Sequence, residues 1–428
     1  MSAAPSSSPD SARRCRSRAA SSTRWSEGLT KVSAPLLAAT LAGLVMLGPF
    51  SVDTYLPSFP AIQREFAVTP LEVQQTLTAY LIAFAVMTLF HGALSDSFGR
   101  RPVILACLAI HVLGSIGCTF AQSFPQLLFF RGAQGFSAGV GWVVGRAIVR
   151  ESFPGHDAQR LLSLITMIFG LAPALAPIIG GWLQGAFGWR AVFAFLTLYG
   201  ALQLVVCARA LPETHPPEKR QPFAPAPLIK IYLALASSSR LRLLCLAVAL
   251  NFCGFFLYVA AAPAVIYGLL GLTEHHFPVL FVPGVLGVML GAFLSHRMAG
   301  RTSRQRTVRT GYFVMFGAAA FNVGFHALYP AALPWTVLPF AAYAVGMALA
   351  APSVQLLVLD LFPENSGTAS SMQGFTHAVF TAFTAALVVP LLSGSGLTLA
   401  LGSLGLLALG CLCWMSFRRI DAPGGEIR

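Results

Sequence analysis

Charged residues are scarce in this sequence. They make up 10% of the 428 residues, while hydrophobic residues make up 56%. A soluble domain carries about 25% charged residues, so this chain has too little polar surface to be one. The formal net charge of +13 would suggest nucleic acid as the partner of a soluble protein. Here the basic residues cluster between apolar blocks and not along a groove, so we expect no nucleic-acid partner.

Further absences narrow the function. The lysines are Lys31, Lys219 and Lys230, and no G-x-x-x-x-G-K-[ST] phosphate loop is present, which argues against an ATP-driven pump. None of the eight cysteines falls in a predicted outer loop, so no disulfide framework is expected. The nine histidines have no metal-ligand spacing, although His111 and His377 lie in predicted helices. We therefore expect no metal and no cofactor.

Long apolar runs are abundant. A membrane-spanning helix needs about 20 mostly apolar residues, and runs of that size recur along the whole chain. The sequence predicts an all-α membrane protein with twelve transmembrane helices, at 32–58, 71–93, 102–122, 125–149, 160–186, 189–211, 241–268, 276–298, 307–328, 333–359, 366–391 and 396–417.

The basic residues test this helix count. With a cytoplasmic N-terminus, 25 of the 28 Lys and Arg residues fall in inner segments, and the exceptions are Arg64, Arg131 and Arg190. The positive-inside rule predicts this asymmetry. The prediction is a multi-pass protein of a bacterial inner membrane with both termini in the cytoplasm and anionic lipid as a partner.

Two segments do not resemble membrane helices. Residues 1–31 are rich in Ser, Ala and Arg, and we expect a disordered basic tail; an organelle transit peptide is the alternative. Residues 212–240 begin with a Pro- and charge-rich stretch typical of a linker. This linker separates bundles of six helices at 32–211 and 241–417, and 418–428 is predicted to be a cytoplasmic tail.

The second half echoes the first. "GALSDSFGRRPV", from Gly92, follows the second predicted helix, and "GAFLSHRMAGRTSRQRTV", from Gly291, follows the eighth. The glycines and arginines recur, whereas His296 lies nearest to the place of the aspartate. An internal repeat of this kind suggests a duplicated six-helix bundle, and some transporters are built from two such halves.

"GALSDSFGRRPV" resembles the loop between helices 2 and 3 of the major facilitator superfamily. "SVDTYLPSFPAI", "RGAQGFSAG", "APALAPIIGGWL" and "LPETHPPEKRQPF" are similar to strings of its Bcr/CflA group of drug-resistance exporters. The resemblance covers about residues 33–418. It implies the major facilitator fold and drug:proton antiport.

The loop after the second helix has two interpretations. One is a plain cytoplasmic turn. The resemblance implies instead a conformational latch, in which Asp96 docks at the N-terminus of the eleventh helix, "PENSGTASS", and the arginines hold acidic partners such as Glu151. A carboxylate at a helix N-terminus is worth roughly 0.3–1 kcal/mol when exposed and up to about 2 when partly buried. The latch residues are Gly92, Asp96, Gly99, Arg100, Arg101 and Glu151.

Two charges fall inside predicted membrane helices. Asp53 lies about six residues before the outer end of the first helix, and Arg131 about six after the outer start of the fourth, so both lie roughly 9 Å below the outer surface at 1.5 Å per residue. A charge in hydrocarbon normally has a partner or a role. A structural ion pair is one interpretation. Proton coupling is the other, because burial favours a neutral carboxyl group and a nearby guanidinium a charged one.

Helices 4 and 5 carry glycine and proline motifs. "GFSAG", Gly135 to Gly139, matches a hydrolase nucleophile elbow, but it lies in an apolar helix and not after a strand. Close helix packing explains it better. In helix 5 the resemblance implies an antiporter motif formed by Pro173, Pro177, Gly180 and Gly181, with Ala176 where a glycine is usual.

Drug-sized ligands bind to apolar, aromatic walls with few polar groups. By analogy, the substrate-binding candidates are Tyr55, Tyr80, Phe84, Phe136, Asn251, Phe255, Tyr258, Met372 and Gln373. We expect a monomeric, proton-coupled exporter of drug-like small molecules that works by alternating access. An amino acid or sugar exporter and a proton symporter are alternatives of the same fold. A membrane-embedded enzyme is a further alternative, but a single Asp–Arg pair gives it little support.

Overall fold

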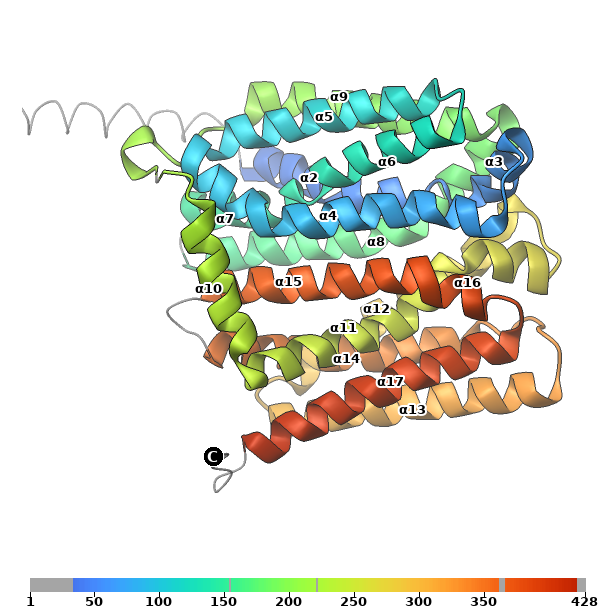
Figure 1. The fold of residues 1–428 in the computed structure, drawn as a ribbon. Coiled ribbons are helices and arrows are strands. Elements are labelled where there is room, and N and C mark those ends of the chain that lie inside the picture. Colours follow the sequence, from blue (N-terminus) through green and yellow to red (C-terminus); the bar gives the residue numbers. More distant parts are fainter. Residues whose placement is uncertain (1–33, 154, 221, 362–365, 422–428) are drawn as a thin grey trace, which may run out of the picture.

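The computed structural model describes residues 34–153, 155–220, 222–361 and 366–421. The regular secondary structure in these ranges is entirely helical. This confirms the predicted all-α fold. Eleven of the described helices are long and apolar enough to cross a membrane, and they run side by side (Figure 1). The predicted tail at 1–31 and residues 422–428 lie outside the described residues.

The first set of helices precedes the predicted linker. It consists of α2 (Ala34–Asp53), η1 (Leu56–Ser58), α3 (Phe59–Phe66), α4 (Pro70–Phe98), α5 (Arg100–Thr119), α6 (Phe124–Ala138), α7 (Val140–Ser152), α8 (Gly155–Phe187) and α9 (Trp189–Ala210). The linker holds η2 (Pro217–Lys219) and α10 (Pro225–Ser237), a helix that its proline-rich sequence did not predict.

The second set follows α10. It consists of α11 (Ser239–Ala260), η3 (Ala264–Leu269), η4 (Glu274–His276), α12 (Phe277–Met298), α13 (Arg304–Leu328), α14 (Leu338–Leu361), α15 (Ser366–Phe383), η5 (Thr384–Val388), α16 (Val389–Leu392) and α17 (Gly396–Ile420). The segments η3 and η5 are π-helical.

Several predicted helices differ from the structure. The seventh, expected at 241–268, ends at Ala260 and is followed by η3. The tenth, expected from 333, begins at Leu338, and the eleventh, expected at 366–391, is divided into α15, η5 and α16. The first was expected to continue to residue 58, but α2 ends at Asp53. Proline has no N–H, so Pro57 cannot donate a hydrogen bond to the Asp53 carbonyl group, and the chain turns there. The fourth, expected at 125–149, is divided into α6 and α7 at Gly139, a residue type that weakens helices.

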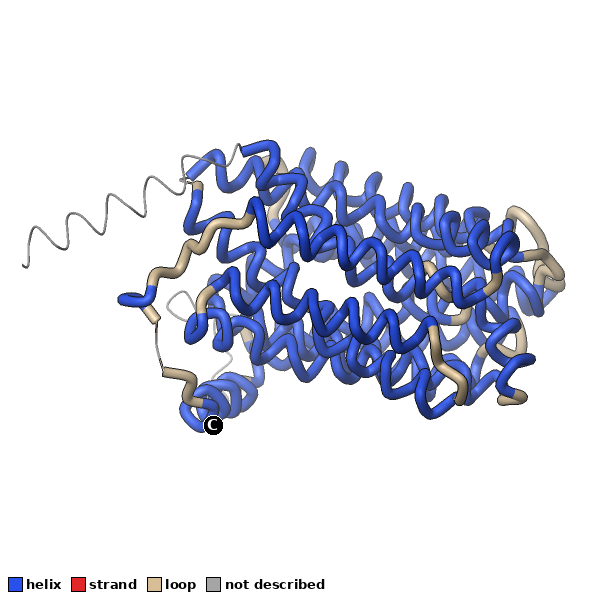
Figure 2. Tube along the Cα trace, turned by 90° about the horizontal axis from the view of Figure 1, so that it is seen from above, coloured by secondary structure: helices blue, strands red, loops and turns tan. Residues whose placement is uncertain are grey.

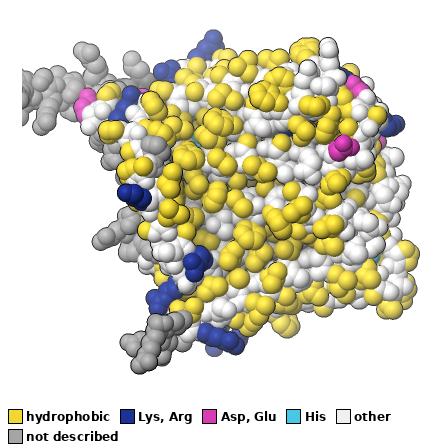
Figure 3. Space-filling model, in the orientation of Figure 1, with side chains coloured by type: hydrophobic (Ala, Val, Ile, Leu, Met, Phe, Trp, Pro, Cys, Tyr) yellow, Lys and Arg dark blue, Asp and Glu magenta, His cyan; other side chains and the backbone are white. Residues whose placement is uncertain are grey.

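The two ends of the helix array differ. We call them the α3 end, which also carries α16, and the α10 end, where α10 crosses the ends of the long helices (Figure 1). Viewed from above, the long helices stay roughly parallel between these ends (Figure 2). On the face shown in Figure 3, Lys and Arg side chains gather mainly at the α10 end, while hydrophobic side chains cover the middle.

The packed cores show how the two sets of helices meet. One buried cluster combines residues of both sets near the α3 end, including Tyr55 and Phe193 with Tyr258 and Phe277. Two further buried clusters lie toward the α10 end. One, around Leu41 and Val144, is formed by the first set, and the other, around Leu244 and Met315, is formed by the second set with α10. The sets thus share a core at the α3 end and keep separate cores at the α10 end.

Candidate functional site

Asp53 is the last residue of α2 and is 4% exposed. None of the hydrogen bonds or ion pairs found among the described residues reaches its carboxylate. A helix C-terminus carries a partial negative charge, so the position itself does not stabilise a negative side chain. Asp53 is therefore a buried acid without a fixed counter-charge.

Arg131 lies on α6 with no exposed surface. Its guanidinium carbon lies 4.1 Å from the ring centroid of Tyr55, 4.7 Å from that of Tyr80 and 5.9 Å from that of Phe193. Cations are attracted to aromatic faces at such distances, more strongly when water is excluded. The three rings thus compensate part of the cost of burying this charge.

Hydrogen bonds from Arg131 join three helices. Nη1 donates to the Ser51 carbonyl of α2 at 2.9 Å and to Oε1 of Gln134 at 2.8 Å, and Nε donates to the Thr76 carbonyl of α4 at 3.4 Å. Its Nη2 has no partner. The carbonyl it binds is two residues from Asp53, yet the described contacts include no ion pair between Arg131 and Asp53. The structural ion pair considered from the sequence is therefore not formed in this structure.

Polar side chains extend this network into α5. Gln134 donates from Nε2 to the Ser115 hydroxyl at 2.7 Å. The Tyr55 hydroxyl lies 2.9 Å from that of Thr76, and the Tyr80 hydroxyl donates to the Gly48 carbonyl at 3.4 Å. Apart from Tyr55 and Tyr80, these partners could not be predicted from the sequence, because hydroxyl and amide groups in apolar helices show no distinctive spacing.

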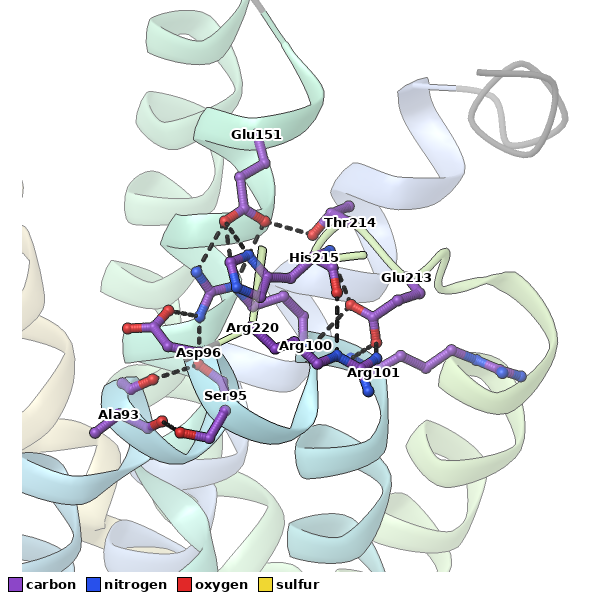
Figure 4. A network of polar contacts seen from close by, with 12 residues as sticks. Ala93, Ser95, Asp96, Arg100, Arg101, Glu151, Glu213, Thr214, His215 and Arg220 are labelled. Carbon is purple, nitrogen blue, oxygen red and sulfur yellow. Dashed lines mark hydrogen bonds and ion pairs between the residues drawn. The ribbon is translucent and has the colours of Figure 1, made fainter. Parts of the chain in front are cut away.

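The loop between α4 and α5 forms a second polar network, at the α10 end (Figure 4). Arg100 lies 2.8 Å from Glu151 of α7 and 2.5 Å from Asp96, and it donates to the Ser95 hydroxyl at 2.6 Å. Asp96 has a half-exposed side chain. The start of the eleventh helix, where Asp96 was expected to dock, includes residues 362–365, which lie outside the described residues.

Glu213, three residues after the end of α9, binds the backbone of this loop (Figure 4). Its carboxylate accepts the backbone N–H groups of Arg100 at 3.0 Å and Arg101 at 3.3 Å. The Arg101 guanidinium donates to the Ala208 carbonyl at 2.6 Å, and among the described contacts it reaches no acidic side chain. Glu213 lies in the predicted linker and was not among the residues expected to have a role, although an acid in a stretch with basic residues could have indicated one.

The two glycines of the loop differ in their need to be glycine. Gly99 has a φ of 100°, and a Cβ there would lie 2.5 Å from Glu213 Oε2 and 2.6 Å from Arg220. A side chain at Gly99 would therefore strain the turn and displace Glu213 and Arg220 from the loop. Gly92 would place a Cβ 3.8 Å from Val143, an ordinary contact, so helix packing does not require glycine at that position.

The glycines of helices 4 and 5 lie at tight crossings. A Cβ on Gly135 would collide with the Tyr80 carbonyl of α4, and one on Gly141 would lie 2.5 Å from the Leu44 carbonyl of α2. Gly180 faces the Thr54 carbonyl, and Gly181 faces the Glu274 carbonyl of the second set. "GFSAG" lies at the end of α6, where the Ser137 hydroxyl donates to the Gln134 carbonyl at 2.8 Å, so this string is not a nucleophile elbow. Pro173 and Pro177 lie within the continuous helix α8.

The predicted substrate-binding residues fall into separate groups. Tyr80 stacks on Phe84 beside Arg131, whereas Phe255 stacks on Phe340 of α14. Tyr258 accepts a hydrogen bond from Asn322, and Asn251 donates to Tyr312, so both polar groups are bound within the second set. Gln373 is buried, Met372 is half-buried and Phe136 is exposed. The structure therefore does not bring all the candidates to one surface.

Comparison with known proteins identifies the class. A family model of the Major Facilitator Superfamily matches residues 41–385. The chain therefore belongs to the major facilitator superfamily, and it is a multi-pass membrane transporter.

Individual relatives agree with the predicted group. A bicyclomycin resistance protein homolog of Haemophilus influenzae is 30% identical over 357 residues, which cover 82% of this chain and 87% of that protein. Multidrug resistance protein D of Escherichia coli is 28% identical over 375 residues, covering 87% and 93%. The human organic anion transporter MFSD10 (TETRAN) superposes with a TM-score of 0.68 at 18% identity, over 90% of this chain and 98% of that one, a likeness that shows the fold.

Proposed function

We propose that this chain exports drug-like small molecules across the bacterial inner membrane in exchange for protons. In this proposal twelve membrane segments, with α6 and α7 counted as one, form two six-helix bundles joined by residues 212–240. The concentration of basic side chains at the α10 end supports a cytoplasmic location for that end and for both termini. The names of the bicyclomycin- and multidrug-resistance relatives support the substrate class.

The observation that carries the proposal is the environment of Asp53. A buried carboxyl group without a fixed counter-charge is less costly when it holds a proton. Arg131 lies close by but is bound to the Ser51 carbonyl. Movement of α2 against α6 would alter the distance between carboxylate and guanidinium, and with it the preference for the charged form. Asp53 then takes up a proton in one arrangement of the helices and releases it in the other.

The packing supports alternating access. The two sets share a core at the α3 end, where the Tyr267 hydroxyl also donates to the Pro57 carbonyl at 2.7 Å. Cores at the α10 end are separate. We propose that the described arrangement is closed at the α3 end, and that the cycle transfers the tight contacts to the α10 end. There the network of Asp96, Arg100, Glu151 and Glu213 acts as the latch.

The test is growth of a drug-sensitive bacterial host that expresses the gene, on a panel including bicyclomycin, chloramphenicol and sulfonamides. Export predicts a raised inhibitory concentration for at least one compound, lost when a proton uncoupler is added. Expression without any change across the panel, together with secretion of an amino acid or sugar, would show that the chain carries a metabolite instead.

A further inference from the structure

We propose a second ligand-binding site at the α3 end, for an uncharged and mainly apolar molecule that carries a hydrogen-bond acceptor. The site is a cavity of about 550 Å³ between the two sets of helices. Pockets for drug-sized ligands measure about 300–1,000 Å³, so the space suits one such molecule. None of the predicted substrate-binding residues lines it, and the site does not depend on the proposed direction of transport.

The walls select for an apolar ligand. They come from α3 and the start of α4 on one side, and from the end of α11, η3 and α16 on the other. Four of the lining residues are Pro60, Pro70, Pro263 and Pro390, and no lining residue is charged. Prolines have no backbone N–H, so these stretches of wall offer rings and no donors. A charged ligand would lose its hydration here without gaining a counter-charge.

Gln74 is the polar lining residue whose amide is buried and unpaired, whereas the other polar lining residues, Gln63, Thr69, Tyr267 and Ser393, are not buried. Gln74 is 5% exposed, it lines the cavity, and its Nε2 has no hydrogen-bond partner. Buried polar groups in proteins are nearly always bonded, so an unpaired amide requires an explanation. Neighbouring Gln75 donates to the Leu71 carbonyl at 3.5 Å and lies outside the cavity wall. In this proposal the Gln74 side chain turns toward the cavity, and a carbonyl or sulfonyl oxygen of the bound molecule accepts a hydrogen bond from its amide.

The backbone around the cavity is irregular in the way that binding sites often are. Ala264, Tyr267 and Gly268 belong to the π-helical segment η3, and Val389 and Pro390 follow the π-helical segment η5. Such π-segments are rare, and they occur frequently at functional sites. The segment η3 forms one wall of the cavity, and the residues after η5 form another. The Tyr267–Pro57 hydrogen bond joins the η3 wall to the first set.

Because both sets contribute walls, a ligand in this cavity favours the arrangement in which the α3 end is closed. A ligand shifts an equilibrium by its difference in affinity for the two states. Occupancy should therefore slow the transport cycle instead of replacing the transported substrate.

Benzophenone is a suitable probe, because it is apolar, carries one carbonyl acceptor and inserts into C–H bonds on irradiation. The purified full chain in detergent is irradiated with increasing benzophenone, and the labelled residues are mapped by mass spectrometry. We expect saturable labelling of residues such as Leu71, Ala264 and Val389. Gln74→Leu should weaken this labelling about 2- to 10-fold, the value of one hydrogen bond, and the matched control Gln75→Leu should leave it unchanged.

Ala264→Trp fills the cavity and should abolish labelling of Leu71 and Val389. If this variant fails to elute as a folded monodisperse protein, the Gln74 and Gln75 variants still decide the question. Labelling that does not saturate, or that falls equally in both glutamine variants, would overturn the proposal. Displacement of the probe by phosphatidylglycerol at low micromolar concentration would show that the cavity holds lipid, and would overturn it as well.

Discussion

At the scale of single residues, the proposed proton coupling involves two buried residues, Asp53 and Arg131, that form no ion pair with each other in the described structure. Asp53 ends α2 without a partner, and Arg131 is held by carbonyl groups and aromatic rings. Each group can therefore be changed without leaving the other as half of a broken ion pair. This separation makes their roles distinguishable by mutation.

Asp53→Asn should abolish transport driven by a pH gradient, because asparagine cannot carry a proton, while substrate binding persists. Everted vesicles with a pH-sensitive dye report substrate-induced proton flux. The matched control is Asp360→Asn, an exposed acid at the end of α14 that pairs with Arg304. Unchanged proton flux in Asp53→Asn would remove Asp53 from the mechanism.

Arg131→Ala should reduce both transport and stability. It removes the Arg131 donor from the Ser51 carbonyl and leaves Gln134 Oε1 with only the weak Cys118 thiol donor at 3.8 Å. One such loss costs about 1–3 kcal/mol. A lower midpoint of thermal unfolding in detergent is expected. Arg131→Lys should restore function only in part, because a point charge cannot make the same set of bonds as a planar guanidinium group. Normal transport and an unchanged unfolding midpoint in Arg131→Ala would contradict this role.

At the scale of helices, close crossings fix the geometry around Asp53. Gly180→Ala should destabilise the protein by about 1–3 kcal/mol, as overpacking usually does, because the new methyl group collides with the Thr54 carbonyl next to Asp53. Gly170→Ala is the control, since a Cβ at that position of the same helix α8 meets nothing within 4 Å. Thermal unfolding of both variants measures the difference, and equal midpoints would show that α8 and α2 separate easily.

The contact between Glu213 and the loop that joins α4 to α5, called here the Glu213 clamp, is a second feature at the scale of helices. Glu213→Gln should weaken the hold on the backbone of Arg100 and Arg101 and shift the balance between the two access states. A loss of about 1–2 kcal/mol corresponds to a roughly five- to thirty-fold change in that balance. Accessibility of a single cysteine at Ser97 to a membrane-impermeant maleimide reports the shift. Glu218→Gln, in the same segment but exposed and without a described contact, should change nothing.

Most of the long helices could be predicted from the sequence, because long apolar runs leave little choice in a membrane, whereas eleven of the predicted twelve spans are found among the described residues. Counting residues placed Asp53 and Arg131 at a common depth, and the structure brings Arg131 to the α2 backbone two residues from Asp53. It could not predict that Arg131 binds the Ser51 carbonyl in preference to the carboxylate, because that choice depends on side-chain direction and on the surrounding rings. Similarly, the Glu213 clamp joins positions 113 residues apart, and no local pattern records such a contact.

At the scale of the whole molecule, the contacts between the two sets are concentrated at the α3 end. Gly185 of α8 faces His275 of η4, where a Cβ would lie 2.9 Å from the imidazole ring. Cysteines at these two positions, in a background without native cysteines, should form a disulfide that stops transport until a reductant is added. Cysteines that replace Arg304 and Asp360, which pair within the second set, joined by a bifunctional maleimide, should leave transport unchanged. Transport that continues with the first disulfide formed would exclude opening of the α3 end.

The division of helix 4 at Gly139 also affects how the chain enters the membrane during synthesis. Neither α6 nor α7 meets the length and hydropathy of a membrane span. An arginine such as Arg131 raises the free energy of membrane insertion by about 2.5–3.5 kcal/mol when it lies at the centre of a helix. Gly114 and Gly117 of α5 lie against Gln134 and Phe130 of α6. We therefore expect α6 to leave the translocon together with α5, with its arginine covered by protein from the start. The order of helices in the gene would then be part of what makes this arginine tolerable.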